Sequence, residues 1–297
     1  MHYMGGTSPP KDPAKWYAFI AQVFQGLVER YGAAEVRTWR IEVWNEPQGC
    51  GFFCPPNRDN LAAYLSLYNT TASAIASVDP FIPVGGPATA ALAWVPEFIN
   101  YTAATKAPAA FVSTHSYPTD YRNPSHRTEW EEGVLANADI AKKAGFPYVM
   151  TEFSAGLSNE AYDAPFAASF IVHATAALLA ATHIPTMSFW TFTDIFEEPG
   201  FDSNAWAQTF GIQTKYGVPK PAYRALQLLA RFPKVSEAHM CGASRCTAPN
   251  QATPSTLPLV HCPARRPHML FPHKIQLFLG PTFPLTLVFF YNPLPFC

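Results

Sequence analysis

Short apolar segments and helical segments alternate along most of this sequence, and that order constrains the fold more than any other feature. Apolar runs that read as buried strands occur in RIEV, FIPVGGPA, AAFVSTHSYP, FPYVMTEFS and PTMSFWTFTD. Helical spacing of apolar residues predicts helices over 12–32, 61–78, around 94–99, over 129–144, over 165–181 and in KPAYRALQLLARF. Strict alternation of this kind means parallel strands covered by helices and joined by right-handed crossovers. The predicted class is α/β.

Polar or ionisable groups stand where several of the predicted strands end. A (β/α)8 barrel of the TIM type gathers its active site at the carboxyl ends of its strands, which favours that architecture. A doubly wound nucleotide-binding sheet needs a glycine-rich turn, and the one candidate, VGGPA, lacks G-x-G-x-x-G and contains Pro87. The groups at the strand ends are Asn45, Glu46, His115, Tyr117, Glu152, Asp194, Glu197 and Glu198.

Two of these groups form a pair with a recognisable chemistry. Glu46 follows an apolar run in RIEVWNEP, and Glu152 ends another in VMTEFS, roughly 100 residues later. In a barrel this spacing puts them about three strands apart on one rim. Glycoside hydrolysis needs a protonated acid for the leaving oxygen and an ionised carboxylate for the anomeric carbon. Either glutamate alone would read as a helix cap or a surface ion pair, but together they predict a glycosidase site.

Charge and composition narrow the partners. The chain has 20 Lys+Arg against 21 Asp+Glu, so it offers no basic field for nucleic acid. No run approaches the roughly 20 apolar residues of a membrane span, and no paired-histidine or repeated-cysteine motif predicts a metal site. We therefore expect a carbohydrate substrate and no nucleic acid, membrane, metal or cofactor. The oligomeric state stays open.

Compartment and redox state are less constrained. The start, MHYMGGTSPPKDP, has no basic segment followed by an apolar one, so no secretory signal is predicted. The acceptor patterns Asn69-Thr70-Thr71 and Asn100-Tyr101-Thr102 would fit a secreted or lysosomal protein, and the localisation stays open. The CGFFC segment allows two states, a loop disulfide between Cys50 and Cys54 or two free thiols.

Six stretches carry a resemblance to a known family. In order and spacing, WRIEVWNEP, SVDPFIPVGGPA, FVSTHSYP, YVMTEFS, SFWTFTDIFEE and YGVPKPAYRAL resemble the retaining β-xylosidases and α-L-iduronidases of glycoside hydrolase family 39, over most of residues 5 to 234. The resemblance implies that Glu46 is the general acid/base at the end of barrel strand 4. It also implies that Glu152 is the nucleophile at the end of strand 7.

Further sites follow from the same stretches. The amide of Asn45 is suited to bind a sugar hydroxyl, although a turn-forming asparagine before proline is the structural alternative. The resemblance implies that His115 and Tyr117 orient the nucleophile or the sugar and that Glu197 and Glu198 accept bonds from sugar hydroxyls. Trp190 is either a platform for an apolar sugar face or ordinary core.

Several functions stay open at this point. FWTFTDIFEE is closer to the xylosidases, and no basic cluster near the motifs awaits a uronate, so an α-L-iduronidase-like hydrolase is the alternative. A non-catalytic carbohydrate-binding pseudoenzyme is another. A metal-dependent hydrolase using His115, Glu46 and Glu152 is the third, and it is disfavoured by the absence of a paired-histidine motif.

The resemblance also predicts an incomplete barrel. If Glu46 ends strand 4, only strands 4 to 8 are present and the first strands are missing, because three βα units need roughly 90 residues. Open strand edges would lower stability and turnover and favour aggregation. Residues 1–234 are therefore predicted to be a partial glycosidase barrel, and the Pro-rich residues 235–297 an irregular tail, poorly ordered or non-native.

Overall fold

The protein folds around a parallel sheet whose strand order confirms the predicted α/β class. The computed structural model describes residues 7–120, 127–156, 164–179, 184–194, 211–214, 216–231 and 277–279. In these residues the sheet has the order β5-β4-β3-β2-β1-β6, and all its pairings are parallel. The strands are β1 (Ile41–Val43), β2 (Val84–Thr89), β3 (Phe111–His115), β4 (Tyr148–Phe153), β5 (Thr186–Phe189) and β6 (Leu277–Leu279).

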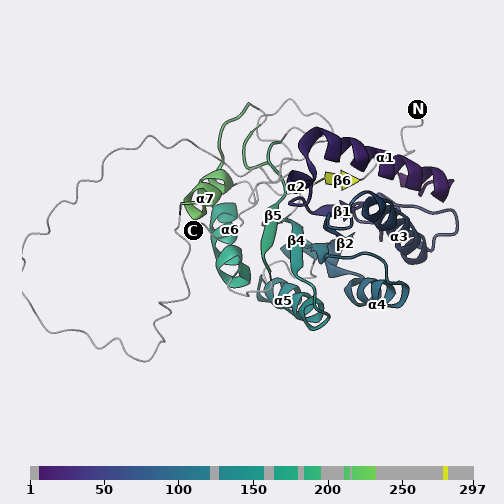
Figure 1. Ribbon diagram of the computed structural model, residues 1–297. Coiled ribbons are helices and arrows are strands. Elements are labelled where there is room, and N and C mark those ends of the chain that lie inside the picture. Colours follow the sequence, from purple (N-terminus) through teal and green to yellow (C-terminus); the bar gives the residue numbers. More distant parts are fainter. Residues whose placement is uncertain are drawn as a thin grey trace, which may run out of the picture.

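Helices connect successive strands and surround the sheet (Figure 1). Each predicted helix is present, and the short α2 was not predicted. No described helix combines the length and apolar character that a membrane crossing requires. The helices are α1 (Pro13–Tyr31), α2 (Ala33–Val36), α3 (Asn60–Val78), α4 (Val95–Thr105), α5 (Arg127–Lys143), α6 (Pro165–Leu179) and α7 (Pro221–Leu229), with 3₁₀ turns at Ala90–Leu92 and Pro118–Asp120.

The first helix begins and ends where its sequence predicts. The Asp12 carboxylate accepts hydrogen bonds from the backbone N–H groups of Ala14 and Lys15, and Pro13 occupies the first turn. Gly32 ends the helix at φ 84°, a backbone conformation that glycine adopts without steric cost. The chain then turns through α2 and enters β1, the strand that precedes Glu46.

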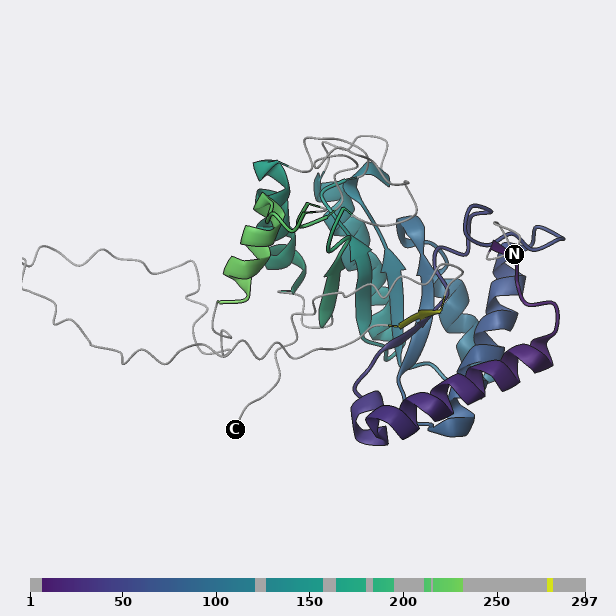
Figure 2. The same cartoon turned by 90° about the horizontal axis from the view of Figure 1, so that it is seen from above.

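The sheet is curved, so its first and fifth strands meet across the concave face. The guanidinium of Arg40, next to β1, donates to the hydroxyl of Thr186 at the start of β5, at 2.9 Å. One strand further along, the hydroxyl of Thr151 in β4 donates to the Glu42 carboxylate in β1 at 2.6 Å. Figure 2 shows the same sheet from above, with α1 and α3 beside one end of it and α6 and α7 beside the other. Five curved parallel strands with outer helices form a half-barrel, as the sequence predicts for a partial (β/α)8 fold.

Large aromatic rings pack the helices onto the outside of the sheet. Between α3 and α4, the rings of Tyr68 and Phe98 meet edge to face, with centroids 4.7 Å apart. Between α5 and α6, the rings of Trp130 and Phe170 lie 5.2 Å apart and both contact Phe153 of β4. All five rings are buried, so this layer fixes the helices that support the carboxyl ends of β3 and β4.

The glycine pair in β2 serves packing on both faces of the strand. A Cβ on Gly85 would lie 2.5 Å from the ring of Phe111, and one on Gly86 would collide with the hydroxyl of Tyr64. That hydroxyl donates to the Val43 carbonyl at 3.1 Å and so joins α3 to β1. VGGPA is therefore a tightly packed strand, as expected when it is not a phosphate-binding loop.

The predicted irregular tail contains one described element. Leu277–Leu279 forms β6 and pairs in parallel with β1, in the register Ile41 to Leu277 and Val43 to Leu279. The segment thus adds a strand to an edge that was predicted to be open. The rest of residues 235–297 lies outside the described residues, and the boundary at residue 234 stays a prediction.

Candidate active site

Four of the predicted site residues converge at the carboxyl ends of β1, β3 and β4. Glu46 follows β1, His115 ends β3, Tyr117 stands two residues beyond it, and Glu152 lies near the end of β4. The carboxyl ends of parallel strands share one rim of the sheet, so residues far apart in sequence meet there. His115 is fully buried, while the side chain of Glu46 keeps 17% of its surface exposed and that of Glu152 keeps 10%. The two carboxylates are therefore partly exposed to solvent, and the imidazole between them is buried.

One imidazole nitrogen joins the two carboxylates. His115 Nδ1 lies 3.1 Å from Glu46 Oε1 and 3.2 Å from Glu152 Oε2. One oxygen of each glutamate and one ring nitrogen of His115 all lie within 4.8 Å of one another. The curved sheet thus brings together two carboxylates from strands that are not neighbours.

The backbone at Glu46 departs from ordinary strand geometry. Glu46 has φ 45° and Trp44 has φ 71°, both in the left-handed region that side chains other than glycine disfavour. Such a conformation costs about 1–3 kcal/mol and persists only where the surroundings impose it. Here the Glu46 N–H donates to the Ala88 carbonyl at 2.8 Å and the Trp44 indole donates to the Phe52 carbonyl at 3.0 Å. These bonds turn the Glu46 side chain toward the rim.

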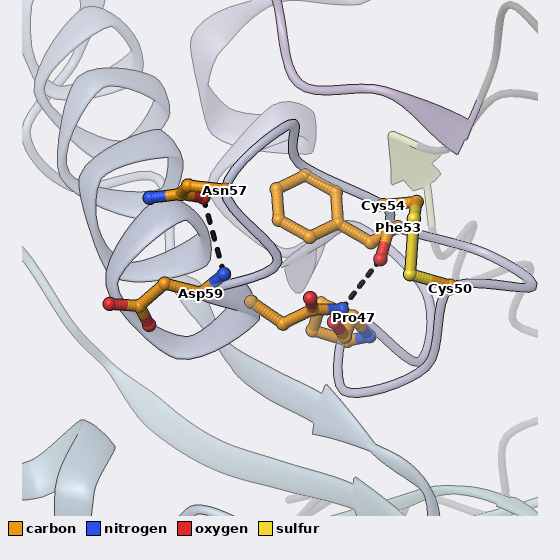
Figure 3. The surroundings of a disulfide bond; sticks show 7 residues. Pro47, Cys50, Phe53, Cys54, Asn57 and Asp59 are labelled. Carbon is orange, nitrogen blue, oxygen red and sulfur yellow. Dashed lines mark hydrogen bonds between the residues drawn. A yellow bond between two sulfur atoms is a disulfide. The ribbon is translucent and has the colours of Figure 1, made fainter.

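The segment after Glu46 is closed by a disulfide between Cys50 and Cys54, which decides between the two predicted redox states (Figure 3). The ring of Phe53, fully buried, packs edge to face on Trp44 with centroids 5.3 Å apart. The Asn60 amide at the start of α3 donates to the carbonyls of Pro47 and Phe53, at 2.9 and 2.6 Å. The loop that follows Glu46 is therefore attached to both β1 and α3.

Tyr117 supports Glu152 from the opposite side. Its hydroxyl donates to Glu152 Oε1, and its backbone N–H donates to the Asp120 carboxylate at 2.7 Å. Burial raises the pKa of Tyr117 well above its usual value, and the Glu152 charge raises it further, so the phenol keeps its proton. Burial also raises the pKa of Asp120. Glu152 thus has the Tyr117 phenol as hydrogen-bond donor on Oε1 and the His115 imidazole as an ion-pair partner on Oε2, while the hydrogen bond of His115 Nδ1 is with Glu46.

The electrostatics of His115 are set by the carboxylates around it. Burial lowers the pKa of its imidazole, but Glu152, Glu42 and Glu46 together raise it by more, so it lies well above the usual value of 6.5. The raised pKa favours the imidazolium form, in which both nitrogens can donate. A positive charge between Glu46 and Glu152 limits the mutual repulsion of the two carboxylates.

The other predicted sugar-binding residues are placed unevenly. Asn45, half-buried, directly precedes Glu46. Trp190 follows β5 and is also half-buried. Its backbone N–H donates to the carbonyl of Phe153, the residue after Glu152, at 2.8 Å. Glu197 and Glu198 lie outside the described residues, so their role stays a prediction.

The segment after Trp190 is fastened by an ion pair that the sequence did not reveal. Lys220 Nζ lies 2.8 Å from Asp194 Oδ1 and 2.7 Å from Oδ2, and both side chains are buried. Asp194 Oδ1 also accepts from the Gly211 N–H at 2.8 Å. The pair therefore ties the segment after β5 to the residues just before α7. Glu42, Thr151 and Asp120 were also missed, and a glutamate inside the apolar run RIEV was the one signal that could have found Glu42.

Glu46, His115 and Glu152 are also the group whose donor atoms could hold a metal ion. An imidazole ligand must be neutral, because the ligand lone pair is otherwise occupied by a proton. Burial lowers the pKa of His115, but Glu152, Glu42 and Glu46 raise it by more, so a proton competes with a metal ion for the ring nitrogen.

Comparison with known proteins agrees with this geometry. The family model for Glycosyl hydrolases family 39 matches residues 1–238. A β-xylosidase of Caldicellulosiruptor saccharolyticus is 38% identical over 242 residues, which are 78% of this chain and 49% of that protein. A β-xylosidase of Geobacillus stearothermophilus is 32% identical over 243 residues, which are 75% of this chain and 47% of that protein. The chain thus spans about half the length of these curated relatives.

A solved structure extends the likeness to three dimensions. The family 39 β-xylosidase from Caulobacter crescentus superposes with a TM-score of 0.67 at 35% identity, covering 76% of this chain and 48% of that one. The half-barrel sheet, the convergent carboxylates and the matched segments all lie within the region that the family model covers. The chain belongs to family 39 of the glycosyl hydrolases.

Proposed function

We propose that the chain carries the catalytic pair of a retaining exo-acting β-xylosidase, with Glu46 as general acid/base and Glu152 as nucleophile. The observation that carries the proposal is the convergence of both carboxylates on His115 Nδ1 at one rim of the half-barrel. Family membership supports glycosidase chemistry, and the β-xylosidases at 38% and 32% identity support xylose as the sugar.

The separation of the two carboxylates favours retention of configuration. One oxygen of each lies within 4.8 Å of the other. Retaining enzymes hold the two carboxyl groups about 5 Å apart, whereas inverting enzymes need about 6.5–9.5 Å to admit a water molecule between them. The short distance leaves room for direct attack on the sugar but not for an intervening nucleophilic water.

The contacts of each carboxylate fit one role in a double displacement. Glu152 accepts a hydrogen bond from Tyr117 and lies 3.2 Å from His115 Nδ1, and both contacts stabilise the ionised form that attacks the anomeric carbon. Glu46 is the more exposed of the two and donates a proton to the leaving oxygen. The glycosyl ester on Glu152 is then cleaved by water, from which Glu46 takes a proton.

Sugar recognition involves the residues around the pair. We assign Asn45, next to Glu46, to a sugar hydroxyl, and Trp190, next to β4, to an apolar sugar face. His115 and Tyr117 act on the sugar through the two carboxylates, because both are buried, Tyr117 is hydrogen-bonded to Glu152, and His115 Nδ1 contacts Glu46 and Glu152. Glu197 and Glu198 are proposed as further acceptors for sugar hydroxyls.

The test is release of nitrophenol from p-nitrophenyl β-D-xyloside by the whole chain, with Glu152→Gln and Glu46→Gln as variants. Exposed Glu132→Gln, on α5, is the matched control. Glu152→Gln should lose at least about 1000-fold in kcat/KM, Glu46→Gln should lose mainly in kcat because p-nitrophenolate leaves with little help from an acid, and the control should keep its activity. Azide added to Glu46→Gln should restore turnover and give a β-xylosyl azide, because retention involves two inversions. An α-linked azide would rule out the assigned roles.

Other outcomes would select the alternatives. Hydrolysis of an aryl α-L-iduronide in place of the xyloside would indicate the iduronidase-like activity. Xylose binding without turnover would indicate the carbohydrate-binding pseudoenzyme, and loss of activity with a chelator would indicate the metal-dependent hydrolase. Because an incomplete barrel would leave strand edges open, the same assay on a form completed with further barrel strands separates low activity from a wrong assignment.

A further inference from the structure

The acidic residue Glu42 is buried in the half-barrel, and no role in the proposed reaction has so far been given to it. It occupies the middle of β1 between Ile41 and Val43, and its side chain has no exposed surface. A buried carboxylate is costly unless hydrogen bonds or an opposite charge compensate it. Its surroundings therefore indicate why the strand keeps an acid at this position.

Each oxygen of Glu42 has its own neighbour. The hydroxyl of Thr151, one residue before Glu152 on β4, donates to Oε1 at 2.6 Å. Oε2 lies 4.0 Å from His115 Nε2, beyond hydrogen-bond length but within the range of an ion pair between buried side chains. Thr151 thus fixes a carboxylate that faces the far side of the His115 ring.

The two nitrogens of His115 consequently face different carboxylates. Nδ1 lies 3.1 Å from Glu46 and 3.2 Å from Glu152, while Nε2 faces Glu42. The ring is fully buried, so its orientation depends on these partners and not on water. A carboxylate on the Nε2 side favours the orientation in which Nδ1 lies between the catalytic pair.

We propose that Glu42 is a positioning residue: fixed by Thr151, its carboxylate holds the His115 ring with Nδ1 directed at both Glu46 and Glu152. The inference rests on the function proposed above and extends it to a residue that does not reach the sugar. A negative charge on the Nε2 side favours the imidazolium form of the ring, in which Nδ1 carries a proton and lies 3.1 Å from Glu46 and 3.2 Å from Glu152. A neutral ring has a proton on one nitrogen alone, and the contact at Nδ1 then depends on the tautomer.

The charges around the ring agree with this role. The acids that face His115 are Glu42 and Glu46 from the β1 segment, Glu152 from β4, and Asp120 from the turn after β3, where Tyr117 stays protonated. Burial lowers the pKa of His115, and Glu152, Glu42 and Glu46 raise it by more. Of the acids that raise this pKa, Glu42 is the one on the Nε2 side, where removal leaves the catalytic pair intact.

The experiment measures the pKa of His115 directly in the whole chain. Histidine-labelled protein is titrated by NMR, and the His115 signal is assigned from its loss in His115→Gln. In Glu42→Gln the Thr151 bond retains an acceptor but the charge is removed, so the pKa of His115 should fall by about 1–3 pH units. Exposed Glu132→Gln is the control and should leave it unchanged. An unchanged His115 pKa in folded Glu42→Gln would overturn the proposal.

Two further variants keep the test informative if Glu42→Gln does not fold. Glu42→Asp keeps the charge and should retain most of the raised His115 pKa. Should Glu42→Gln not fold, Thr151→Val is decisive, because it frees Glu42 while preserving every charge. A His115 signal and pKa in folded Thr151→Val that match the wild type would overturn the proposal.

Kinetics with the aryl β-xyloside provide a second readout. Glu42→Gln should lower kcat about tenfold with KM changed less than about threefold, since it disturbs the catalytic pair and not the sugar contacts. Equal kcat in the variant and wild type would also count against the proposal. If no xylosidase activity exists, the proposed function fails, yet the NMR titration still reports whether Glu42 governs His115.

Discussion

Breaking the buried pair of Lys220 and Asp194 should destabilise the protein far more than breaking the partly exposed pair of Arg37 and Asp79. The side chain of Lys220 has no exposed surface and that of Asp194 has 3%. In Lys220→Met the Asp194 charge stays buried, and the Gly211 N–H still donates to it. Removing one partner of a buried pair typically costs about 3–5 kcal/mol of unfolding free energy.

A double variant separates the unpaired charge from lost packing. Asp194→Asn retains an acceptor for Gly211 and removes the charge, so Lys220→Met/Asp194→Asn should cost only about 1–2 kcal/mol. The matched control is Arg37→Met, because the Arg37–Asp79 pair at 2.8 Å involves an arginine that is 46% exposed. That variant should lose at most about 1 kcal/mol.

The assay is urea unfolding followed by circular dichroism, with thermal unfolding as a second measure. Lys220→Met should lower the thermal midpoint by roughly 10 °C relative to the wild type, and the double variant should recover most of that loss. Because the pair fastens the segment after Trp190, xylosidase activity at a temperature well below the midpoint should fall in parallel. If Lys220→Met costs no more than Arg37→Met, or the double variant costs the sum of the singles, the reasoning is wrong.

Three further predictions concern the site. Tyr117→Phe removes the donor on Glu152 Oε1 and should lower kcat for the aryl xyloside about 10- to 100-fold, and equal kcat in steady-state assays would contradict this role. Cys50→Ala/Cys54→Ala opens a short loop and should lower the unfolding free energy by about 2 kcal/mol in urea; reducing agent should do the same to the wild type but not to the variant. Because its carboxylate neighbours outweigh burial and raise the pKa of His115, the stability that it contributes is complete below pH 6.5 and is lost as the pH rises through the raised value. The difference in unfolding free energy between wild type and His115→Gln should therefore shrink from pH 6 toward alkaline pH, and a constant difference would refute it.

Local signals in the sequence were sufficient for the order of the elements. Asp12 and Pro13 mark the start of α1, and the β-branched run before Glu46 marks β1, because caps and apolar periodicity act over a few residues. The convergence of Glu46 and Glu152 was also predictable, since parallel strands with helical crossovers place their carboxyl ends on one rim.

Contacts between distant strands could not be predicted in the same way. In YGVPKPAYRAL the sequence pattern indicates an exposed Lys220. Its burial depends on the pair with Asp194, which lies 26 residues earlier in the chain. Glu42 meets His115 only because the sheet curves, and the pairing of β6 with β1 joins segments that no local pattern connects. The left-handed backbone at Glu46 likewise follows from the bond to Ala88 and not from its own sequence.

The hydrogen bond from Arg40 to Thr186 lies at the amino ends of the strands, away from the two carboxylates. It joins the segments of β1 and β5, the first and last of the five curved strands, so the curvature of the sheet at its amino ends is coupled to the separation of Glu46 and Glu152 at its carboxyl ends. That separation consequently depends on residues outside the proposed sugar site. A substitution at Arg40 would therefore be a way to alter the distance between the two carboxylates without mutating either of them.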